Sequence, residues 1–299
     1  MARMPSQQTP GPVTELDEKT LQCTRTGQVM LDYANARSLM DEIRDYYEQR
    51  KSAPAANLKQ LYYSELYAGV NSWRVGEYHG ASPSPGEIRW QSLGRTQWGD
   101  VSIDRYVLYH SHYLEMPLLW IHKSDQRRRP ALLLLGENGK ATAQDWPEIT
   151  KYLDSGYDVV SIDPRGLGET RMPYKAVSPD DPALAQMDFD QGYMSPLSGV
   201  LADYVYNSIL TGRPYFLQMI EDVEIASRFV HAQLGSPPDF FVTGSGNGYT
   251  LASAVAETLT GAAIIPRPDA QKIKWSDLVD QRRELWPIQF LLPGGAYVH

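Results

Sequence analysis

The spacing of apolar residues divides the chain into a polar start, a helical segment and a long strand-rich remainder. Residues 1–18 are polar and rich in proline, with no periodic apolar positions, which predicts a disordered N-terminus. Apolar residues then recur at every fourth position over 36–51, and an aromatic-rich segment follows at 58–67. This spacing is typical of helices with one buried face, so we expect a helical N-terminal extension over 19–85.

A change from helical spacing to alternation at residue 87 predicts a β-sheet. The alternating segments 87–93 and 103–112, with the short apolar run 116–122, indicate an antiparallel opening. Four later runs are wholly apolar, as in parallel strands that are covered on both faces. These runs are Ala131–Leu135, Val159–Ile162, Phe240–Val242 and Ala262–Ile265.

Helical segments separate these apolar runs. Residues 146–153 fit a short helix, 216–234 carry apolar side chains along one face, and 251–259 are rich in alanine. Strand and helix alternating at this spacing predict a parallel sheet covered by helices on both faces. The predicted fold class is therefore α/β, with a mostly parallel sheet flanked by helices in a domain over 86–299. We expect the four apolar runs to be adjacent parallel strands.

Ligands of open α/β sheets bind at the carboxyl ends of the strands, and three loops there carry informative residues. The first is the glycine-rich loop 136–140. Its backbone N–H groups can line a cleft, as an oxyanion hole requires, so Gly136 and Glu137 are candidate cleft residues. A plain strand-to-helix turn fits this loop equally well.

The second loop contains Asp163, Pro164 and Arg165, directly after an apolar run. An Asp and an Arg that flank a proline can form a buried, bidentate ion pair that fixes a loop. We therefore expect Asp163 and Arg165 to hold the loop rather than to catalyse a reaction.

The third loop, 244–248, joins an apolar strand to the alanine-rich helix, which is the setting of a nucleophile elbow, G-x-S-x-G. The outer glycines are in register, but the central residue is Gly246, which has no side chain with which to attack a carbonyl. We expect unusual backbone dihedrals at Gly246. Ser245 is the alternative nucleophile, although it precedes the apex, and Asn247 is a further cleft candidate. A cofactor-binding glycine turn is disfavoured, because the spacing is not G-x-G-x-x-G and the strand is a late one.

From about residue 20 to the end, the sequence resembles the acetylxylan-esterase-like branch of the α/β-hydrolase family. The segments that carry the resemblance are Thr24–Val29, Asp163–Thr170, Leu210–Pro214 with Asp222 in the following helix, Gly244–Gly248 and Phe290–Gly295. The resemblance implies an α/β-hydrolase fold, and a carbohydrate or small ester as the ligand, with acetylated sugars as the substrate class.

The sequence departs from that family at the residues that would perform the chemistry. The family has serine where this chain has Gly246, and it has an Asp and then a His after two further strands. The sequence ends at His299 before those strands can occur, so we expect a C-terminally truncated domain with a degenerate nucleophile position. The other five histidines all precede the elbow, and we expect no general-base role for His299.

Composition excludes several classes of partner and cofactor. The net charge of -8 argues against nucleic acid, which requires clustered Lys and Arg. Cys23 is the only cysteine, so neither an intramolecular disulfide nor a thiolate metal cluster is expected. No apolar run is long enough for a membrane span, and we see no motif for a cofactor and no set of metal ligands. No signal peptide is visible, which predicts a cytoplasmic protein, or an exported one if an upstream segment is missing.

Three functions are consistent with these observations. The first is a pseudo-hydrolase, a degenerate domain that keeps a cleft for binding, or for structure within a larger or oligomeric assembly. The second is a working carboxylic ester hydrolase that uses Ser245 or residues from a partner chain. The third is a truncated reading frame without a selected function. The glycine at 246 favours the first and third over the second.

Overall fold

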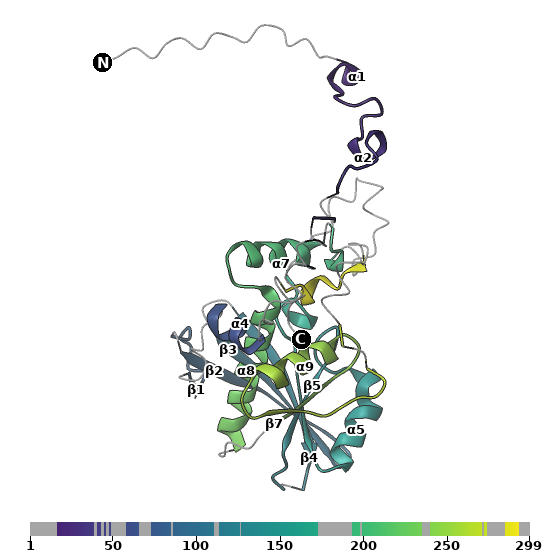
Figure 1. Cartoon of the computed structure of the whole chain (residues 1–299). Helices are drawn as coiled ribbons and strands as arrows, with labels where there is room; N and C mark the ends of the chain where they lie inside the picture. Colours follow the sequence, from purple (N-terminus) through teal and green to yellow (C-terminus); the bar gives the residue numbers. More distant parts are fainter. Residues whose placement is uncertain are drawn as a thin grey trace, which may run out of the picture. The chain divides into compact units, whose positions relative to one another are not determined.

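The chain is described from a computed structural model (Figure 1). The described residues are 17–38, 41–42, 45, 48, 58–65, 73–84, 86–110, 114–125, 127–172, 193–197, 199–234, 240–270, 272–273 and 285–292. The predicted disorder over 1–18 and the predicted helix over 36–51 fall largely outside these residues, as does His299.

The chain divides into two compact units, residues 1–52 and 53–299. The described part of the first unit contains two single-turn helices, α1 (Glu18–Leu21) and α2 (Val29–Asp32). The carboxylate of Asp32 accepts hydrogen bonds from the backbone N–H and the hydroxyl of Thr26, at 2.8 and 3.0 Å. This contact fixes the turn that precedes α2.

The described residues of the second unit form an eight-stranded mixed sheet in the order β1-β2-β3-β4-β6-β5-β7-β8. Strands β2, β3, β4 and β6 pair antiparallel in that order. The other neighbouring pairs, including the run β6-β5-β7-β8, are parallel. The strands are β1 (Arg74–Glu77), β2 (Glu87–Trp98), β3 (Val101–His110), β4 (Leu114–Lys123), β5 (Ala131–Leu135), β6 (Asp158–Ile162), β7 (Phe240–Gly244) and β8 (Ala262–Ile264).

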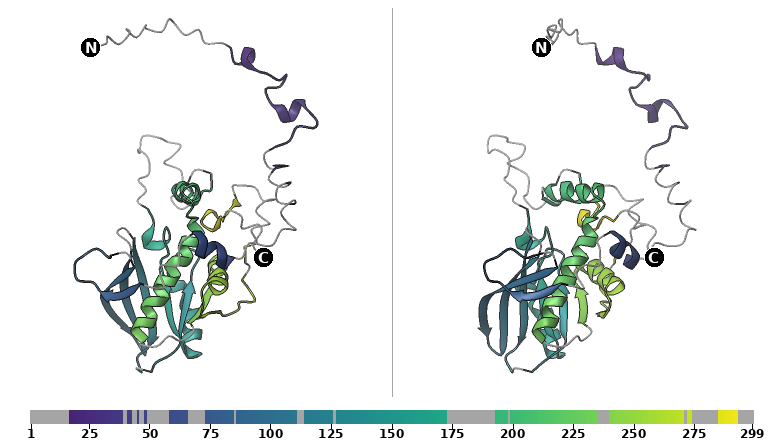
Figure 2. Two further views of the ribbon diagram at one scale, coloured as in Figure 1. Left: turned by 60° about the vertical axis from the view of Figure 1, so that its left-hand side comes forward. Right: turned by 90° about the vertical axis from the view of Figure 1, so that its left-hand side faces the viewer.

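Helices cover the sheet because its parallel strands are apolar on both faces. The helices in the described part of this unit are α4 (Leu58–Glu65), α5 (Trp146–Asp154), α7 (Val200–Leu210), α8 (Tyr215–Leu234) and α9 (Gly248–Thr258). Short 3-10 turns lie at Ala143–Asp145, Gly168–Thr170 and Ile288–Phe290. Figure 2 shows α8 lying across the sheet. No described helix is both long and apolar enough to cross a lipid bilayer.

Alternate residues of the parallel strands contribute to separate cores on the two faces. On β5, Leu133 and Leu135 pack into one cluster with α8 and α9, whereas Leu132 and Leu134 pack into the other with α5. This alternation follows from the two-residue period of a strand, which sends successive side chains to opposite faces.

The predicted sheet is confirmed: the four apolar runs are adjacent parallel strands, preceded by an antiparallel opening. Two details differ from the sequence analysis. Strand β8 is only half-buried although its run is wholly apolar. Strand β1 lies within 19–85, the segment expected to be helical. It was not predicted because four residues are too few to show the two-residue period of a strand.

Candidate functional site

The loop after β7 is a sharp strand-to-helix turn, as the sequence predicts. The N–H of Ser245 still donates to the carbonyl oxygen of Leu135 on β5, at 3.0 Å, so this residue continues the strand pairing. Gly246 then turns the chain with a φ of +53°, and α9 begins two residues later. The expectation of unusual dihedrals at Gly246 is therefore confirmed. Ser245 is half-buried one residue before this apex.

Two glycines allow this turn to pack directly against β5. A Cβ on Gly244 would overlap the backbone of Gly248, and a Cβ on Gly248 would overlap the carbonyl oxygen of Leu135. Both neighbours are backbone atoms, which cannot move aside as a side chain can. These glycines are therefore required by the close approach of two main chains, whatever the loop does chemically.

The side chain of Glu137, from the loop after β5, lies over the apex of the turn. Its Oε1 accepts a hydrogen bond of 2.5 Å from Nδ2 of Asn247, and a Cβ placed on Gly246 would overlap its Oε2. The space that a side chain at position 246 would enter thus holds a carboxylate. The structure brings together Gly136, Glu137 and Asn247, the three residues that the sequence offered as cleft candidates: Gly136 packs against Gly248 of the turn, and Glu137 binds Asn247.

An arginine from the segment after β8 supports the turn on another side. Nη1 of Arg267 donates to the carbonyl oxygen of Gly244, at 3.0 Å, and lies 2.7 Å from Oε1 of Glu148 on α5. Burial opposes the charge of Arg267, but bonds to Asp269 and the charge of Glu148 raise the pKa of the guanidinium. Arg267 thus links the end of β7 to α5, which lies on the face of the sheet opposite to α8 and α9.

The carboxylate of Asp163 is fully buried and organises the loop after β6. Its Oδ1 accepts from the backbone N–H of Lys140 at 2.6 Å, and its Oδ2 accepts from the Lys140 ammonium at 2.6 Å and from the N–H of Glu169 at 3.1 Å. A Cβ on Gly139 or Gly168 would overlap this carboxylate, so the loops can enclose it only because both residues are glycine.

The expected ion pair between Asp163 and Arg165 is not formed, and each residue has a different partner. Arg165 makes its bidentate contact with Asp222 on α8, with Nε to Oδ2 at 2.9 Å and Nη2 to Oδ1 at 2.5 Å. The backbone N–H of Arg165 donates to the same carboxylate at 2.9 Å, and Oε2 of Glu221 lies 3.2 Å from Nη2. Residues on either side of a proline diverge here, so the two side chains reach different elements. Both still brace the loop.

Asp222 is the charged centre of this buried cluster. Burial alone would raise its pKa, but the charge and hydrogen bonds of Arg165, with His110 close by, lower it to about 2. Nε2 of His110, at the end of β3, lies 3.4 Å from Oδ1 of Asp222. The cluster therefore joins three separate parts of the fold: the end of β3, the loop after β6 and α8.

The chain was compared with known proteins. No protein-family model and no curated protein matches it. Among solved structures, a proposed acetyl xylan esterase from Bacteroides fragilis matches 89% of this chain and 72% of its own, with a TM-score of 0.59 at 13% identity. The chain has an α/β-hydrolase fold. Two acetyl xylan esterases, from Paenibacillus sp. R4 and Thermoanaerobacterium sp. JW/SL YS485, match at 17% and 14% identity with TM-scores of 0.43 and 0.40. The chain spans 59% and 60% of their lengths.

The turn at 244–248 has the strand-to-helix setting that a nucleophile elbow has in an α/β-hydrolase fold, and the loop 136–140 packs against it. A working elbow presents a side-chain oxygen at its apex and backbone donors beside it. This elbow presents a glycine at the apex, with the carboxylate of Glu137 beside it. Asn247, the residue after the apex, engages that carboxylate with its side-chain amide.

Three of the described histidines have partners away from the elbow. His110 is buried beside Asp222, Nε2 of His122 lies 3.1 Å from Asp104, and the ring of His231 packs against Phe240 at the start of β7. Within the described part of the chain, no three His, Cys, Asp or Glu side chains are grouped as a metal site.

Lys140 and Glu148 support the site although the sequence did not predict it, and Asp222 was not predicted as the partner of Arg165. Asp222 did give a signal, because a carboxylate between Met219 and Ala226 lies on the apolar face of its helix. A charge in that position needs a buried partner. Lys140 and Glu148 gave no comparable signal, since charged residues in loops and first helical turns are usually solvated.

Proposed function

We propose that this chain is a non-catalytic α/β-hydrolase-fold domain, a pseudo-hydrolase whose elbow cleft serves binding or assembly. The observation that carries the proposal is the occupied apex: position 246 lacks a nucleophilic side chain, and the Glu137 carboxylate lies where such a side chain would project. The proposed ligand of the cleft is a carbohydrate or a small ester, by the likeness to the Bacteroides fragilis structure.

Electrostatics at the elbow also oppose ester hydrolysis. Acyl transfer develops negative charge on the carbonyl oxygen, and an oxyanion hole stabilises it with donors. A carboxylate about 4 Å from such an oxyanion would oppose it by about 4 kcal/mol at an effective dielectric constant of about 20. That is roughly a thousandfold loss of rate, in addition to the loss of the nucleophile.

Hydrolysis of p-nitrophenyl acetate by the full chain tests the proposal. We expect no saturable turnover above a buffer control for the wild-type protein. Gly246→Ser should not restore it, alone or with Glu137→Ala, because no described histidine is seen at the elbow to act as its general base. A hydrolase that loses its catalytic residues but keeps its oxyanion hole still accelerates hydrolysis on the order of 10³–10⁴-fold over water. In this chain the negative charge of Glu137 would reduce even that residual rate.

Two variants separate the alternatives. Saturable hydrolysis that disappears in Ser245→Ala would show that the chain is an ester hydrolase with its nucleophile one residue before the apex. Hydrolysis that survives this change but disappears in Glu137→Gln would assign the chemistry to the carboxylate. Either result overturns the proposal. A matched substitution on the helix that follows the elbow, Ser253→Ala, controls for general damage, since the Ser253 hydroxyl donates within that helix, to the carbonyl oxygen of Tyr249.

A further inference from the structure

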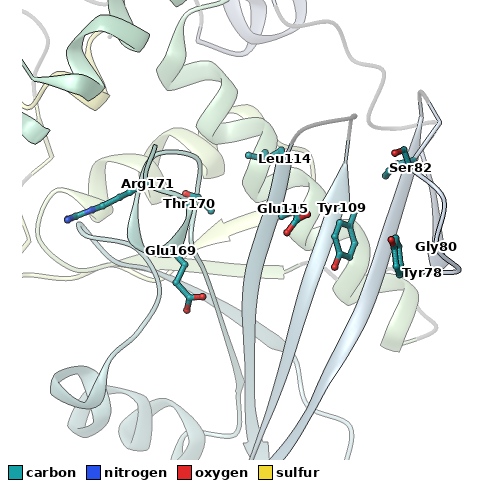
Figure 3. Close-up of a pocket in the computed structure, with 10 residues that line it drawn as sticks. Tyr78, Gly80, Ser82, Tyr109, Leu114, Glu115, Glu169, Thr170 and Arg171 are labelled. Atoms are coloured by element: carbon teal, nitrogen blue, oxygen red, sulfur yellow. The ribbon is translucent and has the colours of Figure 1, made fainter. Parts of the chain in front are cut away.

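A cavity of about 500 Å³ opens between the loop after β6 and the strands β1, β3 and β4. Figure 3 shows Glu169, Thr170 and Arg171 on the side of that loop, and Tyr78 and Tyr109 on the side of the strands. The elbow residues 244–248 and the facing loop 136–140 do not line it. The cavity is therefore a separate candidate site, which nothing in the elbow chemistry explains.

Two tyrosines form an aromatic wall of this cavity. The rings of Tyr78 and Tyr109 are stacked, with their centroids 4.8 Å apart and their planes 24° apart. The hydroxyl of Tyr109 donates to Oε1 of Gln91 at 3.1 Å, which fixes that ring against the sheet. Tyr78 is 36% exposed, so this stack presents aromatic surface to solvent.

Glu115 places a carboxylate beside this wall. It is the register partner of Tyr109 across the antiparallel pair β3-β4, so the two side chains stand on the same face of the sheet. Figure 3 shows Glu115 between Tyr109 and Glu169. Within the described part of the chain, the Glu115 carboxylate has no hydrogen-bond or ion-pair partner, whereas Glu169 is paired with the Lys140 ammonium at 2.5 Å.

The neighbouring cations are directed elsewhere. Arg171 lines the cavity, but its side chain extends away from the two tyrosines, and its guanidinium lies 5.3 Å from the ring centroid of Tyr193 (Figure 3). Arg89, the register partner of Tyr109 on β2, lies 2.7 Å from Glu87. The charge beside the aromatic wall is therefore negative.

We propose that this cavity binds an organic cation, with its ammonium group beside Glu115 and its carbon substituents against the tyrosine stack. An aromatic face attracts a cation through the ring quadrupole, and an adjacent carboxylate adds direct charge attraction. A strongly hydrated metal ion would gain little from the rings, so the chemistry selects an alkylammonium head. The net charge of -8 favours the approach of such a ligand.

Choline and its uncharged isostere 3,3-dimethylbutan-1-ol test the charge requirement at constant shape. We expect choline to bind the full chain with a Kd on the order of 1 mM, followed by NMR titration of its methyl resonance. The uncharged alcohol should bind at least tenfold more weakly, and raising the ionic strength should weaken choline binding. Equal binding of the two compounds, or no binding of choline up to about 50 mM, would overturn the proposal.

Three variants locate the site. Glu115→Gln should weaken choline binding about tenfold, and Tyr78→Leu about twofold to fivefold, as expected for a partly exposed cation–π contact. Both side chains are exposed, so both variants should fold, which circular dichroism checks. Glu257→Gln, a matched surface change on α9, should leave binding unaltered. If Glu115→Gln binds choline as the wild type does, the cation is bound elsewhere and the assignment is wrong. None of these outcomes depends on the elbow, so the pseudo-hydrolase proposal is tested separately.

Discussion

The bidentate contact of Arg165 with Asp222 predicts a large loss of stability in Asp222→Asn. The Asp222 side chain is fully buried and that of Arg165 is 15% exposed. Removing one partner of a buried pair leaves an uncompensated charge, which costs about 3–5 kcal/mol. Glu221 remains within 3.2 Å of the guanidinium, and asparagine keeps an acceptor oxygen, so we expect the lower end, about 3 kcal/mol.

Urea denaturation followed by circular dichroism measures this loss at pH 7. At an m-value of about 3 kcal/mol/M, the midpoint should fall by about 1 M. The matched control is Asp104→Asn, because Arg95 also binds Asp104 through two bonds, of 2.6 and 2.8 Å, but is itself 59% exposed. The Arg95 guanidinium stays in contact with solvent when Asp104 is changed, so no charge is left buried and the control should change the midpoint by a third as much or less.

The pH dependence gives an independent check of the same pair. The pKa of Asp222 is lowered to about 2 from 3.8, so its contribution is present above pH 4 and is lost as the pH falls through about 2. The difference between wild type and Asp222→Asn should thus be constant from pH 5 to 7 and should shrink below pH 4. Equal costs for Asp222→Asn and Asp104→Asn would refute the view that this pair fixes the loop after β6.

Two further predictions concern the packing of the elbow and a buried carboxylate. Gly248→Ala should lower the free energy of unfolding by about 1–3 kcal/mol, because the new methyl group would overlap the carbonyl oxygen of Leu135. In the control Gly76→Ala, on β1, the methyl group meets only the side chain of Arg89, at 3.9 Å, so this change should be neutral. Urea denaturation midpoints compare the two variants. Burial raises the pKa of Asp158 from 3.8 to about 6, so its carboxylate destabilises the fold above pH 6. Asp158→Asn should therefore raise stability by about 1–2 kcal/mol at pH 7.5, an advantage that should vanish at pH 4, and an equal gain at both pH values would contradict this assignment.

The sheet could be predicted because its information is local. Strand β5 is five consecutive apolar residues, all buried, and such a run is stable only where both faces of a strand are covered. The turn at Gly246 could be predicted for the same reason, since the spacing of its glycines lies within five residues. Strand β1 could not, because its four residues carry too little pattern and it is placed by pairing with β2.

The contacts of the site could not be predicted, because they are made between distant parts of the chain. Arg165 is 57 residues from Asp222, and Asn247 is 110 residues from Glu137. Sequence spacing suggested the nearest opposite charge, Asp163, as the partner of Arg165. The backbone directions at Pro164 decided otherwise. Pairing between side chains depends on such directions, which neither periodicity nor composition encodes.

The elbow glycines separate what the fold requires from what a hydrolase requires. Gly244 and Gly248 are packed against backbone atoms, so a domain that had lost all activity would still need them in order to fold. The apex differs, because the atoms that a Cβ at Gly246 would meet belong to the flexible side chain of Glu137, which can move aside. Packing therefore does not require a glycine there, although the positive φ favours glycine over residues with a Cβ. The retained glycines are thus no argument for catalysis, whereas the residue at the apex and the carboxylate above it bear on catalysis directly.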